Sequence, residues 1–214
     1  MKHKRAYSPT EILEMKIPTL EFDGPWEASL GKPAKTGTWI IWGSSGNGKT
    51  SFVMQLAKYL CRFDKVLYDS LEEGTGLSLQ KSMLRHGMRD VSRRFQVLDK
   101  EPIDRLSERL DKRKSPGIVI IDSFQYSRLT YKGYQDFKER HANKLIIFVS
   151  HADGLRPGGR TARSVEYDAD VKIFVQGFKA SCKSRFLDHP STPYVIWEEG
   201  AAKYLLGGDN NLRP

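Results

Sequence analysis

The sequence predicts an α/β protein built on a mostly parallel twisted sheet, with helices on both faces and an antiparallel C-terminal extension. Two observations predict this class. From Thr38 onward, short runs that are apolar throughout alternate with amphipathic helical patterns, which is typical of parallel strands buried on both sides. After residue 168, three apolar runs follow one another with only turns between them, which favours antiparallel strands.

The elements of this core follow in a regular order. The expected strands span residues 38–42, 65–69, 95–98, 117–122 and 144–150, and three further candidates span 170–176, 178–186 and 193–198. The expected helices span residues 49–62, 75–87, 102–114 and about 131–142. Pro102 suits the start of the third helix, and the break Ser115-Pro116-Gly117 ends it.

The two ends of the chain are expected to lie outside the core at residues 37–205. Residues 1–36 are predicted to form an arm or linker, and residues 206–214 a C-terminal tail. The run Ser8-Pro9-Thr10-Glu11 has the pattern of a helix start, and apolar residues follow it at 12–17. We expect this arm either to fold back on its own core or to dock on a neighbouring subunit.

Composition describes a globular protein of one domain. Of 214 residues, 39% are hydrophobic and 29% charged, and no stretch approaches the roughly 18 consecutive apolar residues of a membrane span. We therefore expect no membrane partner. Cys61 and Cys182 form no C-x-x-C pair, which favours two reduced thiols in a cytoplasmic protein. The net charge of +9 favours a polyanionic partner, most often nucleic acid, although many basic proteins bind none.

Residues 43–50 match the phosphate-binding loop pattern G-x-x-x-x-G-K-[ST]. The match lies between an expected strand and an expected helix, which is the context that the motif requires. Glycines let backbone N–H groups converge on a phosphate, and the helix that follows adds its positive dipole end. The residues expected to contact the nucleotide are Gly43, Ser44, Ser45, Gly46, Asn47, Gly48, Lys49, Thr50 and Ser51.

Three positions around this loop have the chemistry of a metal-assisted phosphoryl site. Lys49 places a point charge at the terminal phosphates, and the Thr50 hydroxyl is a ligand that Mg²⁺ prefers. The run Ile118–Asp122 is an apolar strand that ends in a carboxylate. At the carboxyl edge of the sheet, Asp122 would lie beside the loop and hold Mg²⁺ through water.

A second acidic position follows the strand expected at residues 65–69. Glu72 and Glu73 lie just beyond it, where a carboxylate can polarise the water that attacks a γ-phosphate. An acidic helix cap, favoured by the helix dipole, explains the same residues equally well.

Four further segments occur in a specific order. Ser70-Leu71-Glu72 follows a strand, and Phe148-Val149-Ser150-His151 ends another. Residues 164–171 read Ser-Val-Glu-Tyr-Asp-Ala-Asp-Val, and Lys183-Ser184-Arg185-Phe186 follows them. With the phosphate loop, these segments make residues 37–200 resemble the ATPases of the RecA superfamily, especially DnaB-type replicative helicases and RadA/Sms proteins.

The resemblance implies a RecA-like core that binds ATP and Mg²⁺ and hydrolyses ATP. It implies that Glu72 is the water-activating base, with Glu73 as the alternative, and that His151 senses the γ-phosphate. It also implies that Lys183 and Arg185 reach the nucleotide of the adjacent subunit, where a cation stabilises the charge of the transition state. A capping or core histidine and an exposed basic strand are the structural alternatives.

The resemblance also implies contact with single-stranded DNA. The segment Ala152–Ser164 is rich in glycine and arginine and is expected to be a flexible loop that faces a central channel. Arg156, Arg160 and Arg163 would then contact phosphates. A solvated surface loop explains the composition equally well.

A second candidate for nucleic-acid contact is Gln125–Tyr134. Its tyrosines interleave with Arg128 and Lys132, an arrangement in which rings stack on bases while cations follow the backbone. Tyrosines that pack a helix end are the plainer account.

We therefore expect a stand-alone RecA-like motor core of DNA replication or recombination that hydrolyses ATP at the interfaces of a head-to-tail homo-oligomer, a ring or filament. It has neither the four-cysteine zinc module of RadA/Sms proteins nor the helical N-terminal domain of DnaB-type helicases. The alternative is a nucleotide-gated regulatory or loader module of KaiC-like type, without DNA motor activity. A small-molecule kinase is disfavoured by the glutamate and the Lys-x-Arg segment.

Overall fold

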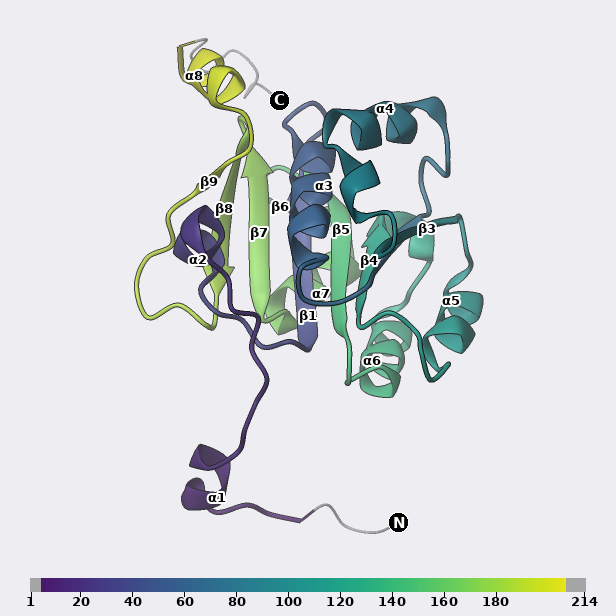
Figure 1. Ribbon diagram of the computed structural model, residues 1–214, viewed down its shortest axis with the longest axis vertical. Coiled ribbons are helices and arrows are strands. Elements are labelled where there is room, and N and C mark those ends of the chain that lie inside the picture. The colour runs from purple at the N-terminus through teal and green to yellow at the C-terminus, as the bar shows by residue number, and fades with distance from the viewer. Residues whose placement is uncertain (1–4, 207–214) are drawn as a thin grey trace.

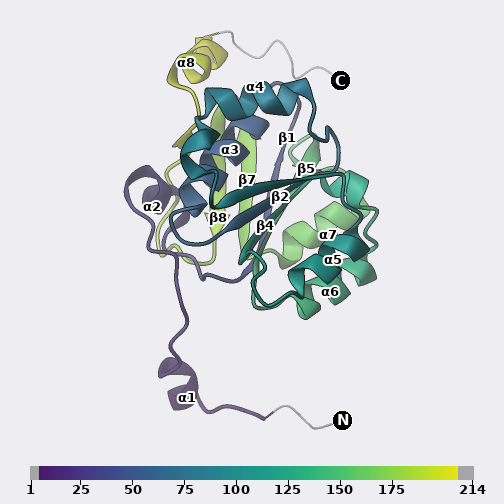
Figure 2. The ribbon, with the colours of Figure 1, turned by 45° about the vertical axis from the view of Figure 1, so that its right-hand side comes forward.

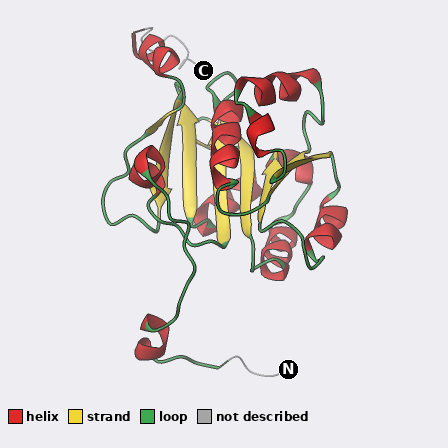
Figure 3. Ribbon diagram, in the orientation of Figure 1, coloured by secondary structure: helices red, strands yellow, loops and turns green. Residues whose placement is uncertain are grey.

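A nine-stranded sheet runs through the computed structural model, which describes residues 5–206, and helices cover both of its faces (Figures 1 and 3). The strands are β1 (Gly37–Gly43), β2 (Val66–Ser70), β3 (Phe95–Asp99), β4 (Ile118–Asp122), β5 (Leu145–Asp153), β6 (Arg156–Pro157), β7 (Val171–Gln176), β8 (Lys179–Ser184) and β9 (Tyr194–Val195). Their order across the sheet is β3-β2-β4-β5-β1-β7-β8-β9, with β6 paired to β5.

Eight α-helices and two 3₁₀ turns lie within the described residues. They are α1 (Pro9–Leu13), α2 (Gly24–Leu30), α3 (Lys49–Leu60), α4 (Leu77–Arg85), η1 (Met88–Val91), α5 (Ile103–Leu110), η2 (Phe124–Ser127), α6 (Tyr131–Arg140), α7 (Arg160–Asp168) and α8 (Glu198–Leu206). The strands and helices that the sequence predicts between residues 38 and 150 are all present, so the predicted fold class is confirmed.

The strands from β3 to β7 are parallel, and only β8 and β9 run antiparallel. The antiparallel part therefore begins one strand later than predicted. The reason is that α7 acts as a crossover helix and returns β7 parallel to β1. Gly177 and Phe178 then turn the chain back in two residues, both with positive φ, as a tight hairpin with right-handed strand twist requires.

The sheet is buried on both faces, and each face has its own core. The side of α2, α3 and α4 packs against alternate residues such as Trp39 and Ile41, while α5, α6 and α7 pack against Ile40 and Trp42 (Figure 2). Strands that are apolar at every position satisfy both layers at once, which is why they lack a period-two pattern.

The expected N-terminal arm consists of two parts that differ in burial. Residues 5–17 extend away from the body with α1 (Figure 1), where the predicted cap forms between Ser8 and Glu11 and Leu13 is 86% exposed. Residues 18–36 instead belong to the core: Leu20 is fully buried, and Trp26 stacks on Tyr194 at 4.1 Å. Folding back therefore describes residues 18–36, and docking on a neighbour stays a prediction for residues 5–17.

The ends and the thiols complete the description. The predicted tail at 206–214 lies outside the described residues except for Leu206, which ends α8. Cys61 and Cys182 are buried and free. Within residues 5–206, no helix combines the length and the apolarity needed to cross a membrane.

Replacement of Trp26 by Ala tests whether this segment is core. We expect Trp26→Ala to lower the free energy of unfolding by about 3–5 kcal/mol, because it leaves a cavity among packed aromatic rings. Leu13→Ala, in the exposed arm, should change it by no more than about 0.5 kcal/mol. Denaturant unfolding measures both, and equal effects would contradict the division of the arm.

Candidate nucleotide-binding site

The carboxyl ends of four neighbouring parallel strands, β2, β4, β5 and β1, meet at one edge of the sheet, the upper edge in Figure 1. The register places Ser70 beside Asp122 in β2 and β4, and Gly43 beside His151 in β1 and β5. The phosphate loop, Asp122, Glu72 and His151 consequently line one cavity of about 540 Å³. Such an edge is where ligands bind in open α/β sheets.

The phosphate loop connects β1 to α3 and lines the cavity, except at Asn47. Gly46 and Gly48 have φ values of 78° and 91°, which favour glycine. Asn47 points elsewhere: its Oδ1 accepts a hydrogen bond from the Gly177 N–H at 2.8 Å, and its carbonyl accepts one from the Phe178 N–H. Asn47 therefore ties the loop to the β7–β8 turn instead of facing the cavity.

The loop residues that line the cavity are Gly43, Ser44, Ser45, Gly46, Gly48, Lys49, Thr50 and Ser51. Lys49 and Thr50 form the first turn of the twelve-residue helix α3, so the unpaired amides and the positive dipole end of that helix face the same space. This geometry suits a phosphate group.

Asp122 is the carboxylate that the structure places opposite Thr50 in the cavity lining. Its Oδ2 accepts a hydrogen bond of 2.5 Å from the Tyr68 hydroxyl. Burial raises the pKa of Asp122, and the charges of Glu72 and Glu73 add to the rise, while Tyr68 and Lys49 oppose it. A divalent cation would relieve this crowding of negative charge.

The residues present fit Mg²⁺ held together with a nucleotide. Thr50 and Asp122 offer hard oxygen donors, and Mg²⁺ usually takes only one or two protein ligands when phosphates supply others. Consistent with this, no group of three or more His, Cys, Asp and Glu side chains between residues 5 and 206 is arranged to hold a metal by itself.

Glu72 and His151 form a pair at the rim of the phosphate loop. Glu72 Oε2 lies 2.7 Å from His151 Nε2, and Ser123 Oγ lies 3.4 Å from the same nitrogen. Burial raises the pKa of Glu72, but hydrogen bonds from His151 and Ser123 and the charges of His151 and Lys49 outweigh it, so the pKa lies below its usual value. Glu72 is thus held ionised, as a group that accepts a proton must be.

Three cavity residues were missed by reasoning from the sequence. Tyr68 lies inside β2, Arg85 in the last turn of α4, and Phe178 at the tip of the β7–β8 hairpin. Arg85 is exposed and takes part in no ion pair with another described residue. No local motif marks these positions, because only the tertiary fold brings them to the phosphate loop.

Lys183 and Arg185 do not approach this cavity. Because β8 runs antiparallel to β7, Lys183 pairs with Lys172 near the start of β7, at the opposite edge of the sheet from the phosphate loop. Arg185 is exposed and forms an ion pair with Asp170 at 3.3 Å. These cations therefore do not serve the cavity of their own chain.

The expected flexible loop at Ala152–Ser164 is wrong in its conformation. Residues 152–157 form a β5–β6 hairpin, whose Leu155 carbonyl accepts a hydrogen bond from the Trp42 indole, and α7 begins at Arg160. Buried small residues on the inner side of α7, such as Ala162, order the segment despite its polar composition.

Two of the three arginines of this segment are engaged within the chain. Arg156 pairs with Glu166 at 3.1 Å, and Arg163 pairs with Asp153. Arg160 is exposed and has no ion-pair partner in the part of the chain that the structure describes.

The second basic segment lies beside another cavity at the same edge of the sheet. Arg128 and Lys100 both have positive φ, at 56° and 54°, and both line a cavity of about 550 Å³ together with Tyr126. Lys132 lies further on, in α6, 3.8 Å from Asp136. Positive φ in side chains of this size is uncommon and tends to cluster at functional sites.

Sequence comparison identifies no relative, whereas comparison of the fold does. No protein-family model and no curated protein matches the chain. Solved structures match with low identity. The ATPase domain of a DnaB-type helicase aligns with a TM-score of 0.55 and 19% identity over 74% of this chain and 80% of that chain.

Two further matches come from archaea. The flagellar accessory protein FlaH from Methanocaldococcus jannaschii gives a TM-score of 0.55 and 18% identity over 74% of this chain and 80% of that one. A KaiC-like protein from Pyrococcus horikoshii OT3 gives 0.61 and 17% identity over 83% of this chain and 93% of that one. The chain has the fold of RecA-like P-loop ATPases, as the resemblance predicts.

Proposed function

We propose that this protein is a Mg²⁺-dependent ATPase that assembles head to tail, completes each site with cations of the next copy, and acts on single-stranded DNA. The observation that carries the proposal is the division of the site between two edges of the sheet. Glu72, Lys49 and Asp122 lie at one edge, while Lys183 and Arg185 lie at the other.

The residues of the cavity have separable tasks in this proposal. The loop amides and Lys49 bind the β- and γ-phosphates, and Thr50 and Asp122 hold the Mg²⁺ that neutralises them. Glu72 accepts the proton of the attacking water, which requires the ionised form that the lowered pKa provides. His151, 2.7 Å from Glu72, is placed to respond to the γ-phosphate and to orient the base.

Cationic help from a neighbour would supply what this cavity lacks. Charge on the phosphoryl oxygens rises in the transition state, and a guanidinium delivered there stabilises it. Because Arg185 lies at the opposite edge from the loop, one protomer's Arg185 reaches a loop only on another molecule, through a heterologous contact. Such contacts generate rings or filaments.

Support for single-stranded DNA comes from one exposed ring and from cations that make no ion pair among residues 5–206. Arg128 and Lys100 flank Tyr126, which is 52% exposed and lies with its ring centroid 6.3 Å from that of His151. A nucleic acid bound there would contact a residue that touches the sensor histidine, which couples DNA to hydrolysis. Arg160, at the start of α7, is the remaining cation of the basic segment that can contact a phosphate.

The alternative is a nucleotide-gated regulatory or loader module without motor activity. The fold favours neither candidate, since the matched structures include a flagellar accessory protein and a KaiC-like protein. Stimulation of ATP hydrolysis by single-stranded DNA would support the motor, and ATP-dependent assembly without DNA affinity would support the module.

Glu72→Gln tests the catalytic base. We expect Mg²⁺-ATP binding to persist and turnover to fall by about 10²–10⁴-fold, because shape and metal donors remain while the proton acceptor is lost. Equilibrium binding and steady-state hydrolysis measure the two effects. If Glu73→Gln abolishes turnover while Glu72→Gln stays active, the base is the neighbouring residue.

Arg185→Ala tests completion of the site by a neighbour. Turnover should fall by about 10³-fold or more while ATP binding changes little, and Arg105→Ala, an exposed arginine on α5, should have no effect. Mixing Arg185→Ala with Lys49→Ala protein should restore part of the activity, since mixed interfaces pair an intact loop with an intact arginine. Absence of rescue despite verified subunit exchange would place Arg185 outside the catalytic mechanism.

The double variant Arg128→Ala/Arg160→Ala tests the DNA surface. Loss of two phosphate contacts should lower the slope of log affinity against log salt by about 1.4, because each contact to a single strand contributes about 0.7. Lys81→Ala/Arg105→Ala removes the same charge elsewhere and serves as the control. An unchanged slope for a single-stranded oligonucleotide would exclude this surface.

A further inference from the structure

A second polar pocket lies at the amino edge of the sheet, opposite the phosphate loop. It has a volume of about 380 Å³ and is formed where α5 leads into β4 and α6 leads into β5. The charged residues of its lining are Asp64, Asp111, Lys112, Arg113, Arg140 and Lys144. Neither the phosphate loop nor the catalytic residues take part in it.

Lys144 is the unusual member of this lining. Its side chain is buried, with 6% of the residue exposed, and its Nζ donates to Ser115 Oγ at 2.8 Å and to the Pro116 carbonyl at 3.0 Å. Both acceptors are neutral, and within residues 5–206 no carboxylate lies within 4.0 Å of Nζ. An ammonium group has three donors, so one donor and the whole charge remain without a partner.

The acidic residues of the lining are already neutralised by other cations. Asp111 forms an ion pair with Arg140, and Asp64 Oδ2 lies 3.3 Å from Lys35 Nζ. Lys112 and Arg113 are exposed at the rim and have no ion pair among the described residues. The pocket therefore presents three unmatched positive charges, one of them buried.

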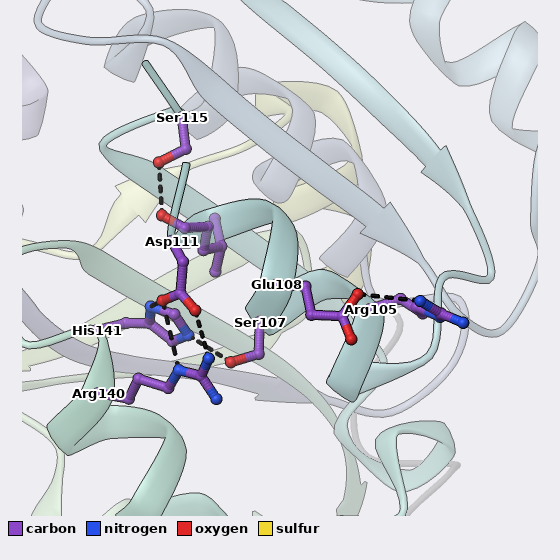
Figure 4. A network of polar contacts seen from close by, with 8 residues as sticks. Arg105, Ser107, Glu108, Asp111, Ser115, Arg140 and His141 are labelled. Carbon is purple, nitrogen blue, oxygen red and sulfur yellow. Dashed lines mark hydrogen bonds and ion pairs between the residues drawn. The ribbon is translucent and has the colours of Figure 1, made fainter. Parts of the chain in front are cut away.

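A network between α5 and α6 makes the wall beside this lysine rigid. Ser107 Oγ lies 2.8 Å from His141 Nε2, and Asp111 and Arg140 meet beside the same imidazole (Figure 4). Ser115 Oγ, which accepts from Lys144, in turn donates to the Leu110 carbonyl (Figure 4). His141 is 1% exposed and acts as a fixed wall of the pocket.

The contact of Ser107 with His141 does not make a nucleophile. Asp111 Oδ1 lies 3.7 Å from His141 Nδ1, beyond hydrogen-bond distance, and its carboxylate is engaged by Arg140. Ser107 lies within α5 and is buried, so no substrate carbonyl approaches its hydroxyl.

Burial of a charge without a counter-ion is costly, and proteins usually pair such a group or coordinate it with a ligand. Burial lowers the pKa of Lys144, and the charges of Asp64 and Asp111 offset only part of that effect. An anion in the pocket would supply the missing charge and accept the free donor.

We propose that this pocket binds a phosphate group, with Lys144 as the buried ligand and Lys112 and Arg113 as ligands at the rim. A phosphate dianion offers several acceptor oxygens to converging cations and fits the volume. The phosphate belongs to a small phosphorylated molecule or to a nucleic-acid backbone. This site is independent of the proposed ATPase function.

Thermal unfolding in the Lys49→Ala background, where the lysine of the phosphate loop is absent, tests the proposal. Inorganic phosphate should raise the unfolding midpoint above that in sodium chloride of equal ionic strength, because it binds only the folded state. Adding Lys144→Met should weaken the apparent phosphate affinity on the order of tenfold, the effect of losing one charged hydrogen bond. Lys81→Met, an exposed lysine on α4, should leave it unchanged.

A second variant and a second ligand complete the test. Lys112→Gln/Arg113→Gln changes only exposed side chains and should also weaken phosphate binding, so it decides the matter if Lys144→Met does not fold. A single-stranded oligonucleotide that gives the same Lys144-dependent shift identifies a backbone phosphate, and a shift with inorganic phosphate alone identifies a small ligand. No phosphate-dependent shift in the parent, or an undiminished shift in the folded pocket variants, would overturn the proposal.

Discussion

The parallel register of β2, β4, β5 and β1 is the constraint on which the nucleotide site depends. Because side chains beyond parallel strand ends meet at one edge, the pairings Ser70–Asp122 and Gly43–His151 bring four distant segments to one cavity. A slip of one residue in either pair would turn the terminal side chains to the other face. The continuous apolar strands, buried against helices on both sides, hold this register.

The β7–β8 hairpin connects the two edges of the sheet. At its tip, Gly177 and Phe178 bond to Asn47 of the phosphate loop, and at its far end Arg185 pairs with Asp170. A nucleotide that moves the loop would therefore pull on the same hairpin that presents Arg185 to a neighbour. This arrangement gives the proposed assembly a physical route by which binding at one site affects the next.

Local patterns predicted those parts of the site that are contiguous in sequence. The phosphate loop, Asp122 and Glu72 each follow an apolar strand, so their positions could be inferred from the strand ends. Tyr68 and Arg85 have no such marker, because they reach the cavity only through sheet order and the placement of α4.

Burial was misjudged where punctuation residues hide an apolar pattern. Prolines and glycines at residues 18–36 suggested an arm, although Leu20 and Trp26 pack into the core. Arginines and glycines at residues 152–164 suggested a flexible loop, but Ala162 and the Trp42 hydrogen bond order it. In both cases tertiary contacts outweigh the local composition, which carries no information about them.

The most direct test of a nucleotide site completed between copies is the rate of ATP hydrolysis per molecule as a function of protein concentration, with Lys49→Ala protein as the blank. If a neighbour supplies Arg185, the rate per molecule should rise with concentration and reach a plateau as assembly is completed. A rate per molecule that stays constant down to concentrations at which mass measurement shows only monomers would contradict completion by a neighbour. A rate equal to that of Lys49→Ala at every concentration would contradict the ATPase itself.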